Sequence, residues 1–295
     1  MKILLATDGQ PPARRAEKVL EKLGRRTGLD VMVIAVAGAF EDVPLLQDWS
    51  RNRITEAEQV AELTATDLRI SGFDVTSLTR AGSPAEEILK AIDDYDIDLT
   101  VLGSGHRTWL GNLILGSVST HVLHSSPSSV LVVHEWFQEP ATGRALVGVD
   151  GSQQALRATE LFSRFADPGR CVVTTMAVAA NAHPVLVPHP ALTPVYEPFD
   201  ASLQEDLIER AGREAEDATQ ILDEAGFETT TLTNLGSAAN VLLKEADSRR
   251  MDLVVVGSRG IGPVRRTVLG SVSDNVARHA AATLVGRERN VPPVA

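Results

Sequence analysis

The sequence has one cysteine, no long apolar run and a shortage of positive charge. Cys171 alone cannot form an internal disulfide, which fits a reducing compartment, and its apolar neighbours predict a buried strand thiol. No apolar run approaches the roughly 20 residues of a membrane-spanning helix. Met1–Asp8 reads as the start of a strand and has no signal-peptide layout. These absences predict a cytoplasmic protein with no membrane partner.

Acidic residues outnumber basic residues by 39 to 28, and the formal net charge is -11. Broad binding to nucleic acid or to anionic membranes needs a basic surface, so the sequence predicts neither partner. A local basic patch remains compatible with one small anion. The 295 residues, 43% of them hydrophobic, suffice for about two domains with a core in each.

An internal repeat organises the chain. Residues 81–119 align without gaps on residues 235–273, and 16 of the 39 aligned pairs are identical at an offset of 154. Residues 3–9 align on residues 145–151 at an offset of 142, so the second copy carries an insertion of 12 residues, the difference between the two offsets. The proline-rich stretch His183–Pro190 is the candidate insertion, either a lid or a plain excursion. The polar seam at Gln138–Gly143 predicts domains at 1–138 and 143–295.

Strand and helix signals alternate in each copy. Helical spacing of apolar residues marks Ala13–Leu23 and Ile54–Ile70, and the tetrapeptide Ser83–Glu86 reads as a capping box with proline at the first helical position. Five strands are expected in the first copy, at Ile3–Thr7, Val31–Val36, Phe73–Thr79, Leu99–Leu102 and Val130–Val133. The more polar Phe73–Thr79 is predicted at an edge. Strands separated by helices predict an α/β fold of two tandem, doubly wound, five-stranded parallel-sheet domains.

Three chemical features fall where strands end, which is where doubly wound sheets bind ligands. They are an acid after the first strand, a glycine after the fourth strand, and a Gly-Ser pair that opens the next helix. In chain order these residues are Asp8, Gly103 and Gly116-Ser117 in the first copy, and Asp150, Gly257 and Gly270-Ser271 in the second.

The loop of residues 257–271 in the second copy has the pattern G-x-x-G, nine residues, then G-S. Glycines let the backbone approach a phosphate, and the helix that starts at Ser271 directs free N–H groups at an anion. Arg259, Arg265 and Arg266 could add charge-assisted hydrogen bonds. Asp150 would repel phosphate, so it is expected to accept hydrogen bonds from ribose. Together these features predict a nucleotide site.

Each feature alone has a structural explanation, as a turn or a helix cap. Their joint spacing and their repetition favour a binding site. The pattern differs from both the P-loop and the dinucleotide fingerprint, neither of which is present in the sequence.

The pattern resembles the universal stress protein family in its tandem form and its ATP-binding branch, over essentially the whole chain. The resemblance implies a HUP-like (adenine nucleotide α-hydrolase-like) scaffold and ATP held without a P-loop, usually with a divalent cation such as Mg²⁺ or Mn²⁺. It also implies a dimeric association of domains.

The same resemblance assigns residues to parts of the nucleotide. Asp150 would contact the ribose or adenine side, and the backbone near Ala177 would meet adenine. The phosphates would be lined by Gly257, Arg259, Gly260, Gly270, Ser271, Val272 and Ser273. The matching positions of the first copy are Asp8, Val36, Gly103, Gly116, Ser117, Val118 and Ser119.

Two departures from the family pattern stand out. His106 occupies the place of Gly260, where glycine serves either a left-handed backbone or clearance, so the second site is expected to be the stronger. Trp109, in the same loop, is expected to pack over the sheet end. The last strand, Thr283–Gly286, is short. Because the family associates through this edge strand, the resemblance implies pairing of the two halves as an intramolecular pseudo-dimer and leaves a homodimer open.

No catalytic set is evident, because the sequence offers no Ser-His-Asp arrangement, no paired carboxylates by the loop and no lysine at the phosphates. His121 and His124 lack a third ligand and read as a surface pair rather than a metal site. The main hypothesis is a regulatory protein that binds ATP or another adenine nucleotide. The alternatives are a slow ATPase or a nucleotidyl or phosphoryl transferase, and an interaction module that binds no nucleotide.

Overall fold

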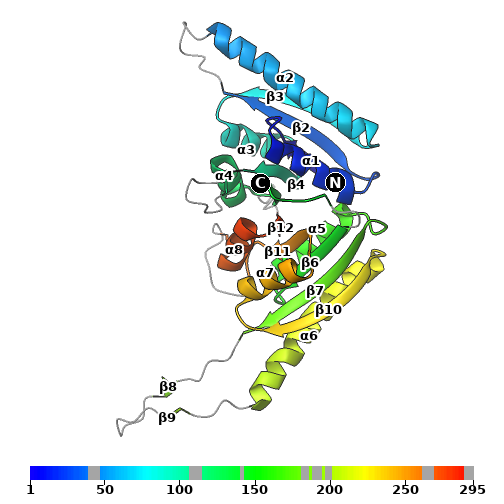
Figure 1. Ribbon diagram of the computed structural model, residues 1–295, viewed down its shortest axis with the longest axis vertical. Helices are drawn as coiled ribbons and strands as arrows, with labels where there is room; N and C mark the ends of the chain where they lie inside the picture. Colours follow the sequence, from blue (N-terminus) through cyan, green and yellow to red (C-terminus); the bar gives the residue numbers. More distant parts are fainter. Residues whose placement is uncertain are drawn as a thin grey trace, which may run out of the picture.

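The computed structural model describes residues 1–38, 47–105, 115–139, 143–180, 186–187, 195–196, 201–260 and 269–288. Its strands form one sheet of ten, in the order β10-β7-β6-β11-β12-β5-β4-β1-β2-β3, and a separate pair, β8 with β9. Five neighbouring strands of the large sheet come from each half of the chain (Figure 1). Within the described parts, no helix is both long enough and apolar enough to cross a membrane.

The first half contains the five parallel strands that the sequence predicts, with β3 at the sheet edge as expected. Its elements are β1 (Lys2–Ala6), α1 (Pro11–Leu23), β2 (Asp30–Ala37), α2 (Gln47–Ile70), β3 (Asp74–Ala81), α3 (Pro84–Asp94), β4 (Leu99–Ser104), α4 (Ser117–Ser125) and β5 (Ser129–His134). Ser83 is the N-cap of α3, and Pro84 follows it. The capping-box prediction is nevertheless wrong in one respect, because the Ser83 side chain makes no capping hydrogen bond.

The second half repeats this arrangement. Its elements are β6 (Gly143–Val149), α5 (Gln153–Phe165), β7 (Cys171–Ala179), β8 (Leu186–Val187), β9 (Val195–Tyr196), α6 (Ala201–Glu224), β10 (Glu228–Leu235), α7 (Ala238–Ser248), β11 (Leu253–Gly257), α8 (Ser271–His279) and β12 (Ala282–Gly286). Helices α2 and α6 have the same length and are offset by 154, so the additional residues lie between β7 and α6, where the β8–β9 pair sits. Most of His183–Pro190 lies outside the described residues.

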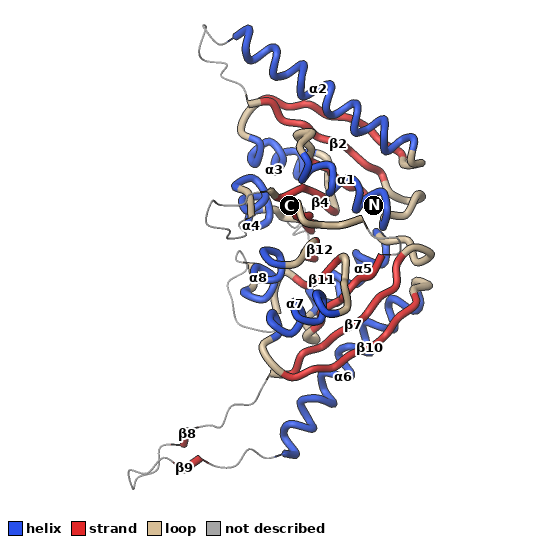
Figure 2. Tube along the Cα trace, viewed as in Figure 1, coloured by secondary structure: helices blue, strands red, loops and turns tan. Residues whose placement is uncertain are grey.

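Alternate residues of each strand pack on opposite faces of the sheet, because successive strand side chains point to opposite sides. In β1, Ile3 and Leu5 belong to one buried cluster, and Leu4 belongs to the other. The first cluster includes residues of α1, α2, α5 and α6, and the second includes residues of α3, α4, α7 and α8. The fold therefore has three layers, with the sheet in the middle and helices on both sides (Figure 2).

The two halves join through antiparallel pairing of β5 with β12, the one antiparallel contact in the described part of the large sheet. Leu131 pairs with Leu284 near the middle of this contact, and both side chains are fully buried. The cores on the two faces therefore continue from one half into the other.

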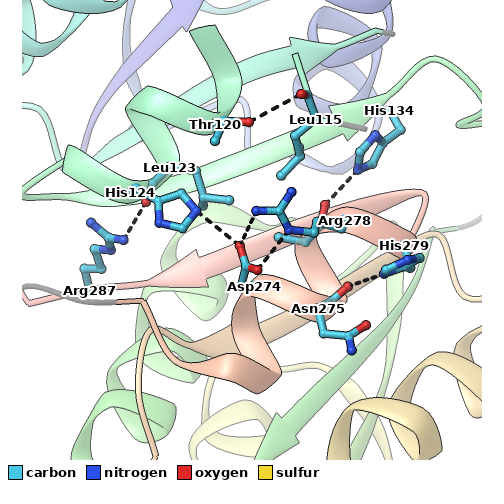
Figure 3. A network of polar contacts seen from close by, with 11 residues as sticks. Leu115, Thr120, Leu123, His124, His134, Asp274, Asn275, Arg278, His279 and Arg287 are labelled. Atoms are coloured by element: carbon cyan, nitrogen blue, oxygen red, sulfur yellow. Dashed lines mark hydrogen bonds and ion pairs between the residues drawn. The ribbon is translucent and has the colours of Figure 1, made fainter. Parts of the chain in front are cut away.

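His134, the last residue of β5, and Arg287, the residue after β12, each hydrogen-bond to a helix of the other half (Figure 3). His134 donates from Nε2 to the carbonyl oxygen of Ala277 in α8, at 2.7 Å. Arg287 donates to the carbonyl oxygens of Leu123 and Ser126 at the end of α4. Burial lowers the pKa of His134, which favours its neutral form.

A second polar contact joins α4 to α8. His124 lies with Nε2 3.1 Å from Oδ1 of Asp274, and Arg278 donates to both oxygens of that carboxylate (Figure 3). Burial favours a higher pKa for Asp274, but the hydrogen bonds and charge of Arg278 outweigh it and lower that pKa. His124 thus belongs to the contact between the halves and is not simply a surface residue paired with His121.

Candidate functional site

The central strands of the second half diverge into helices on opposite faces. Strands β6 and β11 are neighbours, but α5, after β6, packs with one core and α8, after β11, packs with the other. Such a divergence opens a crevice at the carboxyl ends of the strands. A cavity of about 310 Å³ occupies it.

This cavity brings together the predicted acid, glycine loop and helix start of the second half. Of the nine predicted residues, it is lined by Asp150, Gly257, Arg259, Gly260, Gly270, Ser271, Val272 and Ser273. Arg265 and Arg266 lie outside the described residues. The remaining predicted residue, Ala177, does not line the cavity.

Ala177 is fully buried in the core on the side of α5 and α6. Its neighbours Met176 and Val178 line the cavity, because they point to the opposite face of β7. In the first half the equivalent lining residues are Ile34 and Val36, at an offset of 142. The partner of Val36 is therefore Val178, and the alignment of Val36 with Ala177 was wrong by one residue.

Asp150 is held by a local turn. Its Oδ1 accepts a hydrogen bond from the backbone N–H of Ser152 at 3.1 Å, and the hydroxyl of Ser152 caps the start of α5. The other oxygen faces the glycine loop, since a Cβ atom added at Gly260 would lie 2.3 Å from Oδ2. The carboxylate is thus fixed in the cavity lining by its own turn and by the close passage of the loop.

A side chain at position 260 would force the Asp150 carboxylate or the loop to shift. The backbone of Gly260 is outside the left-handed region, so that explanation for the glycine is wrong. The glycine provides clearance, and the group that needs the room is the Asp150 side chain. In the first half the corresponding residue, His106, lies outside the described residues, as does Trp109.

The glycine that ends the fourth strand has a different role in packing. A Cβ atom added at Gly257 would lie 2.7 Å from the backbone nitrogen of Ala155, and one added at Gly103 would lie 2.2 Å from the carbonyl carbon of Pro12. Each glycine therefore lets the start of a helix, α5 or α1, lie directly against the strand end. This packing places the first turn of that helix beside the cavity in both halves.

The start of α8 is tied to the end of β11. Ser273 donates from its hydroxyl to the carbonyl oxygen of Gly257 at 2.6 Å, and the backbone N–H of Gly270 donates to the carbonyl of Ser258 at 2.8 Å. The first backbone N–H groups of a helix have no partner within the helix, and the N-terminus carries partial positive charge. The cavity is therefore bordered by a fixed group of donors suited to an anion.

Arg259 adds a positive charge to the same end of the cavity. Its carbonyl accepts a hydrogen bond from the hydroxyl of Ser152 at 3.3 Å, which joins the loop to the turn of Asp150. Burial, and then the nearby charge of Arg259, lower the pKa of Arg287 to about 10. The Arg259 guanidinium therefore lies near a second positive charge, that of Arg287.

The remaining wall of the cavity is apolar and was not predicted. It is formed by Val149, Met176, Val178, Ala238 and Leu242. The alternation along β7 could have identified Met176 and Val178, but the residues of α7 become neighbours only through the fold. The cavity therefore has one apolar wall, one carboxylate and one cationic, donor-rich end.

The first half has an equivalent cavity of about 350 Å³. It is lined by all seven residues predicted there, namely Asp8, Val36, Gly103, Gly116, Ser117, Val118 and Ser119. Its helix start is tied in the same way, because Ser119 donates to the carbonyl of Gly103 at 2.9 Å. The main difference in the described lining is Gly105, which stands where the second half has Arg259.

The described residues contain no cluster of three or more side chains suited to a metal ion. In the lining of the second cavity, the titratable side chains among these residues are Asp150 and Arg259. These groups can bind and orient a polar ligand.

Cys171 lies in the core, as its apolar neighbours predict. Burial raises the pKa of its thiol to about 12, which suppresses the reactive thiolate. We expect the native protein to react with an excess of a thiol-specific disulfide reagent at least tenfold more slowly than the urea-unfolded protein. Equal rates in the native and unfolded states would contradict the buried position.

Helix α7 ends at Ser248 and is followed by Arg249 and Arg250. Arg249 is the C-cap and pairs with Glu245 at 2.8 Å.

The sequence matches the family model for universal stress proteins twice, at residues 1–134 and 142–285. A universal stress protein of Methanocaldococcus jannaschii is 34% identical over 103 residues, which are 35% of this chain and 64% of that protein. The aligned region thus spans less than two thirds of that relative. A universal stress protein of Mycolicibacterium smegmatis is 29% identical over 238 residues, 80% of this chain and 76% of the relative.

The crystal structure of a universal stress protein from Archaeoglobus fulgidus has the same fold over 98% of both chains. The TM-score is 0.66 at 24% sequence identity. The likeness extends through both halves.

Proposed function

Because this chain belongs to the universal stress protein family in both of its halves, we propose that it is a regulatory protein that binds ATP or another adenine nucleotide. The observation that carries the proposal is the second cavity, in which one carboxylate and one cationic helix start stand at neighbouring strand ends. The first cavity repeats the same plan. Nucleotide occupancy would bias the stability of the protein or its contacts with partners.

The phosphates would lie at the start of α8. The backbone N–H groups of Ser271, Val272 and Ser273 would donate to phosphate oxygens, and Arg259 would neutralise part of their charge. A divalent cation bound with ATP would be held chiefly by the phosphate oxygens themselves. The hydrogen bond of Ser273 to Gly257 supports this assignment, because it fixes the helix start before the ligand arrives.

The sugar and the base would occupy the rest of the cavity. Asp150 would accept hydrogen bonds from ribose hydroxyls, and the backbone at the end of β7, near Ala177, would meet adenine. Met176 and Val178 would pack against the face of the base. The apolar wall supports this orientation, since it offers no group that would bind phosphate.

The second cavity would bind phosphates more tightly than the first. Arg259 is replaced by Gly105 in the first half, so a charge-assisted contact is absent among the residues described there. We further propose that the halves, with domain boundaries at 1–138 and 143–295, work as an intramolecular pseudo-dimer. The pairing of β5 with β12 supports this arrangement.

Thermal unfolding with and without Mg-ATP tests the proposal. A ligand at 100 times its dissociation constant adds roughly 2.7 kcal/mol to the free energy of unfolding, so we expect a rise in Tm of several degrees. Arg259→Gly, which copies the first half, should weaken ATP binding by tenfold or more, because a hydrogen bond to a charged group contributes about 1.5–3 kcal/mol.

Adenosine provides the matched control. It lacks phosphates, so Arg259→Gly should leave its affinity unchanged, whereas Asp150→Asn should weaken adenosine and ATP alike. A wild-type protein whose Tm does not respond to any adenine nucleotide would refute the proposal.

A further inference from the structure

A groove of about 530 Å³ is lined by residues of α1 and α2 in the first half of the molecule. Figure 1 shows where these two helices lie. It is lined by both helices and ends at Gly9, in the loop that follows Asp8 of the first cavity. Two large aliphatic side chains of α2 border it, Leu63 with 67% and Ile70 with 80% of its surface exposed. Such exposure is unusual for side chains of this size when they lie close together on one helix.

The second half shows what this surface is like without the aliphatic side chains. At the offset of 154, Leu63 corresponds to Asp217 and Ile70 to Glu224, and both acids are exposed on α6. The fold itself therefore does not require apolar residues at these positions. Val60, which lines the groove, corresponds to Glu214, and Glu214 forms an ion pair with Arg210 at 3.0 Å. The apolar border is a feature of the first half alone.

The floor of the groove is acidic. Glu17 of α1 is only 8% exposed, and it makes no hydrogen bond or ion pair with any described part of the chain. Glu21 is already engaged, since it accepts from Lys18 at 2.6 Å and from the hydroxyl of Ser71 at 2.7 Å. Asp67 faces Glu17 closely enough for the two charges to interact. The groove thus places three acids between aliphatic side chains, and one of them, Glu17, has no hydrogen-bond or ion-pair partner in the described chain.

The charges of Lys18 and Arg14 favour the charged form of Glu17, but burial and the charge of Asp67 outweigh them, and neither cation pairs with Glu17. Lys18 is paired with Glu21, and the Arg14 guanidinium donates to the carbonyl of Gly9 at 3.1 Å. Burying a carboxylate without a partner is unfavourable, and a cation placed beside it in a dry contact gains more than it would in water. A ligand for this groove therefore needs both a positive charge and apolar surface.

We infer that the α1–α2 groove is a docking surface for an amphipathic helix of a partner protein, one that carries a lysine or arginine between aliphatic side chains. Leu63 and Ile70 are seven residues apart, roughly 10 Å along α2, which matches the spacing of aliphatic side chains two turns apart on a partner helix. The cation between them would reach Glu17. Docking would also contact Gly9, beside the first cavity.

A second copy of this chain is a poorer match for this face. A two-fold contact centred on the groove would bring Glu17 and Asp67 of one copy to the same acids of the other. Like charges brought together at an interface oppose binding. The partner is therefore a different, basic segment.

The test uses a fluorescent synthetic helix of about 18 residues, or five turns, with leucines two turns apart on one face and lysines between them. Fluorescence anisotropy at about 0.15 M salt measures its affinity for the full chain. We expect Leu63→Asp with Ile70→Glu, which copies the second half, to weaken binding by tenfold or more. Glu17→Gln should weaken it by a similar factor, although this variant is expected to be more stable than the wild type.

Two controls separate docking from general attraction of a basic peptide to an acidic protein. Asp217→Asn with Glu224→Gln removes two charges from the equivalent face of the second half and should leave binding unchanged. A peptide with glutamate in place of lysine should not bind. The inference is overturned if the wild type does not bind the leucine–lysine helix, or if the second-half variant loses as much affinity as the groove variants. It is also overturned if sedimentation shows that Leu63 and Ile70 instead hold two copies of the chain together.

Discussion

Replacing Gly103 by alanine is expected to lower the free energy of unfolding by about 3 kcal/mol or more, at the upper end of overpacking effects. The new Cβ atom would lie 2.2 Å from the carbonyl carbon of Pro12 and 2.3 Å from its oxygen. Both are backbone atoms at the start of α1, so no side chain can rotate to make room. Strand β4 and the first turn of α1 would have to separate, in the middle of the first half.

Urea unfolding of the two proteins at equilibrium measures this loss. Gly38→Ala is the matched control, because a Cβ atom there meets no described atom within 4 Å and the backbone is outside the left-handed region. Gly257→Ala should have a smaller effect than Gly103→Ala, since its nearest contact is 2.7 Å. Similar stabilities for the Gly103 and Gly38 variants would show that the helix start is not packed against the strand as described.

Replacing Glu17 by glutamine is expected to stabilise the protein by up to about 3 kcal/mol at pH 8 and by little at pH 5. Burial, and then the charge of Asp67, raise the pKa of Glu17 from 4.5 to about 7. The folded protein therefore holds this proton more tightly than the unfolded chain does. As the pH rises from 4.5 to about 7, the free energy of unfolding falls, and the penalty is fully present at higher pH.

Urea unfolding of the wild type and the variant at both pH values tests this prediction. Glutamine keeps the shape of the side chain without its charge, so the difference between the proteins should grow with pH. Glu58→Gln, at an exposed position of α2, should produce no such change. A difference that is the same at pH 5 and pH 8 would mean that the carboxyl group is not buried in its charged form.

The architecture could be predicted from the sequence because apolar periodicity and the internal repeat indicate the same strands and helices. The predictions that differ from the structure concern single helix ends. Helix α2 begins at Gln47 rather than at Ile54, since its first two turns lack the apolar spacing that marks the rest. The hydrogen bond of the capping box at Ser83 is absent, because a sequence pattern gives the position of a cap and not the orientation of its side chain.

The part of the candidate site that is formed by strand ends and helix starts could be predicted from the sequence. Residues at the ends of β6 and β11 and at the start of α8 meet in one cavity, as the topology requires. The sequence alone does not show which face of β7 borders the cavity. It therefore could not distinguish Ala177, which is buried in the core, from Met176 and Val178, which line the cavity. The close approach of Gly260 to the Asp150 carboxylate joins residues far apart in the chain, and such a contact leaves no local pattern.

The α1–α2 groove could not be predicted from the spacing of apolar residues either. Leu63 and Ile70 lie off the buried stripe of α2, but that alone does not distinguish a docking surface from scattered exposed residues. The comparison with α6 makes the difference, because the same fold carries Asp217 and Glu224 there. An internal repeat thus provides a reference surface within one molecule.

The antiparallel pairing of β5 with β12 also has a consequence for how the protein responds to its own abundance. His134 ends β5 and Gly143 begins β6, so only a short segment tethers the two halves. A short tether holds its ends at an effective concentration in the millimolar range. Assembly of the ten-stranded sheet is therefore independent of dilution, and a cell that makes few copies of this chain has the same sheet as one that makes many.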